Sequence, residues 1–103
     1  MIDAKISKDD KKFLKLALNL ARRNVGLTGK NPSVGCIITF KDIIIGRGNT
    51  QLGGRPHAEI MAIKQAEDHP LLQEKEKYKI LVSTSRWSHV HMKLPLHLAQ
   101  KQL

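Results

Sequence analysis

The chain has 103 residues, of which 41% are hydrophobic and 26% charged, and its 18 Lys and Arg against 9 Asp and Glu give a net charge of +9. This length predicts one small domain; the hydrophobic content excludes a disordered tail, and no apolar run approaches the roughly 20 residues of a membrane helix. The single cysteine excludes an internal disulfide, and the charged N-terminus is unlike a signal peptide, so we expect a cytoplasmic protein with no membrane partner.

The first predicted element is a helix that begins near Ser7. Ser7 and Asp10 have the spacing of a capping box, in which a hydroxyl and a carboxylate satisfy free amide donors at a helix start. Apolar residues then recur with the spacing of one helix face from Phe13 to Val25. Gly26 favours a helix end, because glycine readily adopts a positive φ. We therefore expect one helix with its apolar face toward the core.

Two apolar runs follow, at residues 34–40 and 43–48. The two-residue turn between them favours a β-hairpin. Because both runs are almost continuously apolar, we expect helices to cover both faces of the sheet.

A second helix is predicted over residues 57–68 and a third strand over residues 78–83. From Thr84 onward no pattern favours regular structure. We therefore expect a deaminase-like domain over residues 1–84, for reasons given below, and a divergent, poorly ordered basic tail over residues 85–103, which contains no acidic residue.

His57 and Glu59 form a His-x-Glu pair at the start of the second predicted helix. A histidine at the non-helical entrance can ligate a metal ion, and a carboxylate two residues later can lie beside a metal-bound water. Zinc deaminases use this arrangement, in which the glutamate moves protons. By itself the pair is weak evidence for such a site, because a His-x-Glu sequence also occurs by chance. The alternative is a helix start at which Glu59 complements the helix dipole and His57 is merely polar.

The neighbouring segments NPSVGC (residues 31–36) and GGRPHAEI (residues 53–60) favour the first interpretation. They resemble the deaminase half of the bifunctional riboflavin-biosynthesis deaminase/reductase, and the resemblance extends over about residues 13–82. It implies the three-layer α/β/α fold of the cytidine-deaminase-like superfamily, here incomplete. That fold agrees with the predicted order of helix, hairpin, helix and strand.

The resemblance also implies a chemistry: hydrolysis of an exocyclic amine of a phosphoribosylated diaminopyrimidinone, with zinc as the cofactor. It makes His57 the first zinc ligand, Glu59 the catalytic proton shuttle and Asn31 part of the loop that holds the pyrimidine. A transfer-RNA adenosine deaminase is the nearest relative to exclude, and the Asn-Pro and GGRP segments favour the riboflavin enzyme. A further possible partner is a second copy of the same chain, in a homo-oligomer.

The sequence departs from this family where two zinc-binding cysteines should follow the third strand. Trp87 stands at the position of the first cysteine, and residues 92–97 contain none. Cys36 lies on the first predicted strand, where we expect a small buried core residue. Trp87 itself is interpreted as a partly packed anchor. Two of the three expected ligands are absent, so we expect this chain's hydrolytic activity to be impaired or lost.

Three alternatives remain. His89, His91 and His97 could replace the cysteines, although the indole of Trp87 is far larger than a thiolate and zinc sites tolerate little displacement. The chain could be a non-catalytic remnant or partner subunit with the deaminase fold. A basic nucleic-acid-binding module would fit the charge, but the basic residues are spread along the chain and lack interleaved aromatic residues.

Overall fold

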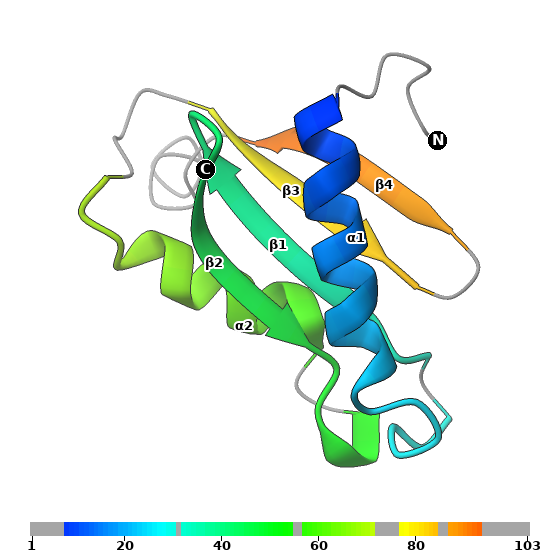
Figure 1. Ribbon diagram of the computed structural model, residues 1–103. Helices are drawn as coiled ribbons and strands as arrows, with labels where there is room; N and C mark the ends of the chain where they lie inside the picture. The colour runs from blue at the N-terminus through cyan, green and yellow to red at the C-terminus, as the bar shows by residue number, and fades with distance from the viewer. Residues whose placement is uncertain (1–7, 31, 55–56, 72–76, 85–86, 94–103) are drawn as a thin grey trace.

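The computed structural model describes residues 8–30, 32–54, 57–71, 77–84 and 87–93 (Figure 1). Within this part of the chain the elements are, in order, α1 (Lys8–Arg22), β1 (Gly35–Phe40), β2 (Ile43–Asn49), the 3-10 turn η1 (Leu52–Gly54), α2 (Ala58–Glu67), β3 (Tyr78–Ser83) and β4 (Ser88–Lys93). The strands form one antiparallel sheet in the order β2-β1-β3-β4. Figure 1 shows α1 across one face of this sheet and α2 against the other.

Helix α1 forms because its apolar residues lie on one face and its charged residues on the other. Phe13, Leu14 and Ala17 are buried and pack against the sheet in one core cluster. The helix ends at Arg22, so Val25, which the periodicity included, lies beyond it and is exposed. Gly26 has the expected positive φ, 84°, but it lies beyond the helix end, which the sequence analysis placed at this glycine.

The predicted hairpin is confirmed. Lys41 and Asp42 both have positive φ angles, 51° and 63°, as a tight turn between two twisted antiparallel strands requires. Every residue of β1 is buried. Its side chains alternate between the two core clusters, since Ile37 packs toward α1 and Ile38 toward α2. The expectation of helices on both faces, and of an α/β/α arrangement, is therefore confirmed.

Helix α2 approaches β2 closely because both elements present small residues where they meet. Ala58 and Ala62 are buried against the strand. A Cβ atom built on Gly48 would lie 2.5 Å from the carbonyl oxygen of Ala58, and one on Gly46 would lie 2.3 Å from that of Ala62. Any side chain at these two glycines would push the helix away. The glycines therefore fix the start of α2 relative to the sheet.

The expectation of irregular structure from Thr84 onward is wrong for residues 88–93, which form β4 and pair with β3 from Ser83↔Ser88 to Tyr78↔Lys93. The strand has only one residue, Val90, packed into a core cluster, so it lacks the apolar run from which a strand is predicted. Backbone pairing and a local turn hold it instead. Residues 94–103 of the expected tail lie outside the described residues.

Two hydrogen bonds close the turn before β4. The amide of Thr84 donates to the carbonyl oxygen of Trp87 over 2.8 Å, and the amide of Trp87 donates to Oγ1 of Thr84 over 3.1 Å. Neither helix in the described part of the chain is long and apolar enough to cross a membrane.

Candidate functional site

His57 and Glu59 lie where the sequence analysis places them, at the entrance and in the first turn of α2. His57 is the N-cap residue, with an extended backbone (φ −72°, ψ 157°), and its side chain makes no capping hydrogen bond. Glu59 follows in the first turn, where a carboxylate complements the positive end of the helix dipole. The change from extended to helical backbone lets both side chains point toward one hollow.

That hollow is a pocket of about 240 Å³ between the start of α2, the loops beside β1 and β2, and the turn before β4. The side chains that line it come from four separate segments of the chain: Pro32, Val34, Thr50, His57, Glu59 and Trp87. The pocket therefore joins the two predicted site residues to Trp87, the residue that occupies the position of a family cysteine.

The floor of the pocket is held by hydrogen bonds that use every polar group of Thr50. Oγ1 of Thr50 accepts from the amide of Val34 over 3.0 Å, and the amide of Thr50 donates to the carbonyl oxygen of Val34 over 2.9 Å. Its own carbonyl oxygen accepts from Nδ2 of Asn24 over 2.9 Å. Because Thr50 is almost fully buried, these bonds fix the floor before any ligand enters.

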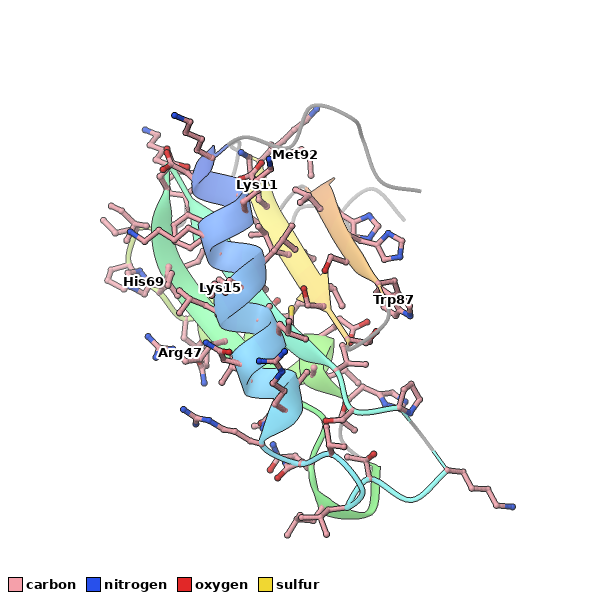
Figure 2. The ribbon with its side chains drawn as sticks, turned by 45° about the vertical axis from the view of Figure 1, so that its right-hand side comes forward. Lys11, Lys15, Arg47, His69, Trp87 and Met92 are labelled. Atoms are coloured by element: carbon pink, nitrogen blue, oxygen red, sulfur yellow. The ribbon has the colours of Figure 1, made fainter. Side chains whose placement is uncertain are left out.

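Trp87 is 43% exposed, so it is partly packed, as the sequence analysis expects, and its side chain also lines the pocket. Figure 2 shows it at the end of β4, at the edge of the sheet. An indole N–H is a hydrogen-bond donor without a lone pair, so Trp87 can stack on a flat ligand but cannot ligate a metal ion.

Cys36 lies in the core beneath this pocket, as expected. It is fully buried in the cluster between β1 and α2. Burial raises the pKa of its thiol, and the negative charge of Glu59 raises it further, to about 12. The thiol is therefore protonated at neutral pH, as a small buried core residue is expected to be.

The pocket-lining side chains that the structure describes do not form a zinc site. In the described ranges, no group of three or more His, Cys, Asp or Glu side chains could hold a metal ion. A catalytic zinc site needs three protein ligands, and among the described residues of the pocket only His57 stands at the position of one. Asn31, the third site residue of the sequence analysis, lies outside the described residues.

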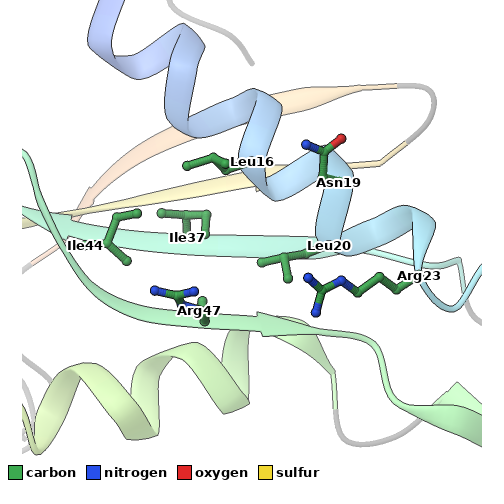
Figure 3. A pocket seen from close by; sticks show the side chains of 7 residues that line it. All are labelled: Leu16, Asn19, Leu20, Arg23, Ile37, Ile44 and Arg47. Carbon is green, nitrogen blue, oxygen red and sulfur yellow. The ribbon is translucent and has the colours of Figure 1, made fainter.

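A second hollow, of about 180 Å³, lies on the other side of the sheet between α1 and β2 (Figure 3). It has an apolar floor and a polar rim, formed by Leu16, Asn19, Leu20, Arg23, Ile37, Ile44 and Arg47. None of the residues that the sequence analysis selected contributes to it. The pocket at the start of α2 is therefore the candidate site.

Residues 7–86 match the family model described as the cytidine and deoxycytidylate deaminase zinc-binding region. The match ends directly before Trp87. The riboflavin biosynthesis protein RibD of Aquifex aeolicus is 46% identical over 57 residues, which are 55% of this chain and 16% of that protein. The diaminohydroxyphosphoribosylamino-pyrimidine deaminase of Buchnera aphidicola from Acyrthosiphon pisum is 39% identical over 54 residues, 52% of this chain and 37% of that protein.

Two solved structures share the fold. A diaminohydroxyphosphoribosylaminopyrimidine deaminase/5-amino-6-(5-phosphoribosylamino)uracil reductase from Thermotoga maritima gives a TM-score of 0.62 at 29% identity, over 73% of this chain and 21% of that one. RibD of Acinetobacter baumannii gives a TM-score of 0.62 at 36% identity, over 74% of this chain and 20% of that one. The chain thus spans a minor part of the length of these relatives.

Proposed function

We propose, since the chain belongs to the cytidine and deoxycytidylate deaminase family, that its pocket binds a phosphoribosylated diaminopyrimidine and does not by itself hydrolyse it. The ligand class is taken from the names of the relatives. We thus propose a non-catalytic protein with the family's fold that binds a small molecule in the cytoplasm.

The pocket supplies the contacts that an aminopyrimidine needs. The carboxylate of Glu59 can accept hydrogen bonds from an exocyclic amine and a ring N–H, and the imidazole of His57 can donate or accept one. The exposed indole of Trp87 offers a flat apolar surface on which the ring can stack. Asn31, next to Pro32 of the pocket wall, is kept in the proposal as a further pyrimidine contact.

Loss of hydrolysis follows from the residue that replaces the first cysteine. Hydrolytic deamination of a pyrimidine needs an activated water, and the family of zinc deaminases obtains it from a bound ion. Here Trp87 lines the same pocket as His57 and Glu59, where a thiolate would be required. This juxtaposition carries the proposal. Glu59 then acts as a hydrogen-bond acceptor for the ligand.

Trp87 is the chain's one tryptophan, so its fluorescence reports on the pocket directly. We expect a saturable fluorescence change on titration with the phosphoribosylated diaminopyrimidine in the presence of EDTA. Glu59→Gln should weaken binding about tenfold, which corresponds to about 1.4 kcal/mol. Glu67→Gln, the same change at the far end of α2, should leave it unchanged.

Two results would refute this proposal. Absence of a saturable fluorescence change in the unmodified chain would show that the pocket does not bind the pyrimidine. Release of ammonia that disappears in Glu59→Gln would show an active deaminase and overturn the claim that hydrolysis is lost.

A further inference from the structure

Three aromatic rings stand in a row along β4. The ring centroids of Trp87 and His89 are 4.5 Å apart, and those of His89 and His91 are 5.6 Å apart with planes tilted by 31°. Because side chains alternate along a strand, His89 and His91 lie on the same face, opposite Val82 and Ile80 of β3. Trp87 also lines the pocket of His57 and Glu59, whereas His89 and His91 are not among the side chains that line it.

The spacing of the two imidazoles suits a shared metal ion. Two histidines on one tetrahedral zinc, with Zn–N bonds of about 2.0–2.1 Å, have ring centroids roughly 5 Å apart. The observed separation of 5.6 Å needs only a small side-chain rotation to reach that value. A pair of imidazoles on one strand face is also held at this distance by the backbone, so little ordering is required when an ion binds.

His89 carries an unsatisfied nitrogen. Its Nδ1 atom is buried and has no hydrogen-bond partner among the residues that the structure describes. Buried polar atoms are nearly always paired, and an exception calls for a water or an ion that completes it. Binding of a cation by this imidazole would supply the missing interaction.

One imidazole of the pair is reachable from solvent. β4 is the last strand of the sheet, whereas α2 packs against β2 and β1 at the opposite edge (Figure 1). His91 is exposed. An ion can therefore bind His91 first without any movement of the helices, and rotation of the His89 ring then brings the unsatisfied Nδ1 atom to the ion.

We propose that His89 and His91 chelate a divalent transition-metal ion on β4, the last strand of the described sheet. Two imidazole nitrogens favour borderline ions, so Cu²⁺ should bind more tightly than Ni²⁺ or Zn²⁺, and Mg²⁺ should not compete. The site is separate from the family's zinc position, because it shares no residue with the His57 pocket.

Trp87 again provides the readout, since its ring lies 4.5 Å from that of His89. Titration of the full chain with NiCl₂, without pyrimidine, should quench its fluorescence, and EDTA should reverse the effect. His91→Asn and His89→Asn should each weaken binding at least tenfold. His69→Asn, the same change in the turn after α2, is the matched control and should leave binding unchanged. Calorimetric titration with ZnCl₂ should rank the metal affinities of these variants in the same order.

Because His91 is exposed, its replacement should leave the circular dichroism spectrum unchanged, so a lost response reports on the site. The proposal fails if His91→Asn binds Ni²⁺ as well as the unmodified chain. It also fails if His57→Asn removes the binding, because the ion would then lie in the pocket. Pyrimidine binding is measured in EDTA, so the failure of either proposal leaves the other intact.

Discussion

The carboxylate of Glu59, at the start of α2, raises the pKa of the buried thiol of Cys36 on β1. Burial is the larger cause and the charge of Glu59 the smaller, and together they raise the pKa of Cys36 from 9.0 to about 12. A residue of the candidate site is therefore electrostatically coupled to the core between β1 and α2.

The raised pKa makes stability depend on pH. Between pH 9 and about pH 12 the unfolded chain loses the thiol proton while the folded chain keeps it, so the free energy of unfolding falls as the pH rises. One such group contributes at most about 1.4 kcal/mol per pH unit. Urea unfolding at pH 8 and pH 10 should show a smaller decline for Cys36→Ala than for the unmodified chain.

The comparison between the two chains removes the effect of groups that titrate in this range independently of Cys36. Tyr78, whose pKa is raised by burial and also by Glu67 and Cys36, is the group whose own contribution changes with the substitution. Equal declines in both chains would contradict the assignment to Cys36.

Gly48 should not tolerate a side chain. A Cβ atom there would lie 2.5 Å from the carbonyl oxygen of Ala58, so Gly48→Ala must displace the start of α2. Overpacking of this kind costs about 1–3 kcal/mol. Thermal unfolding should show the loss, whereas Arg47→Ala, at an exposed neighbouring position, should change stability little. A stable Gly48→Ala chain would contradict the observed approach of helix and strand.

Asp10 and Lys79 form an ion pair between α1 and β3, with 3.1 Å between Nζ and Oδ1. Asp10 is buried, so Lys79→Met removes one charged hydrogen-bond donor from a buried carboxylate and should cost about 1–2 kcal/mol. Asp10→Asn combined with Lys79→Met should recover part of this loss. Additive losses in the double-mutant cycle would show that the two side chains do not interact.

Thr50→Val should lower the free energy of unfolding, although valine and threonine have nearly the same shape. It removes the acceptor of the Val34 amide, which is then left buried and unpaired at a cost of about 1–3 kcal/mol. Denaturant unfolding measures the cost. Thr39→Val, at another buried threonine of the sheet, provides the comparison. Unchanged stability of Thr50→Val would show that this hydrogen bond does not hold the pocket floor.

The regular elements up to Ser83 could be predicted because local pattern and tertiary burial agree. The apolar stripe of α1, the apolar runs of the hairpin and the short run Tyr78–Ser83 each carry their own periodicity. β4 could not be predicted, because it is held by pairing with β3 and contributes only Val90 to a core cluster.

The site was predictable where a motif carries it and unpredictable where long-range contacts do. The His57-x-Glu59 spacing placed both residues at the helix start, as the structure shows. The hydrogen bond between Thr50 and Val34 joins residues 16 apart in sequence, and the local sequence pattern around either residue does not indicate it. Trp87 was located through its family position, but its exposure depends on the turn before β4, which only the structure reveals.

The central claim, a pocket that binds the pyrimidine and leaves it intact, is tested most directly by mass spectrometry of the ligand itself. The protein is dialysed with the phosphoribosylated diaminopyrimidine in EDTA and, in parallel, with zinc, and the retained ligand is recovered. We predict retention above a Glu59→Gln control and an unchanged mass in both arms. Recovery of the product in which oxygen has replaced the amine would contradict the account.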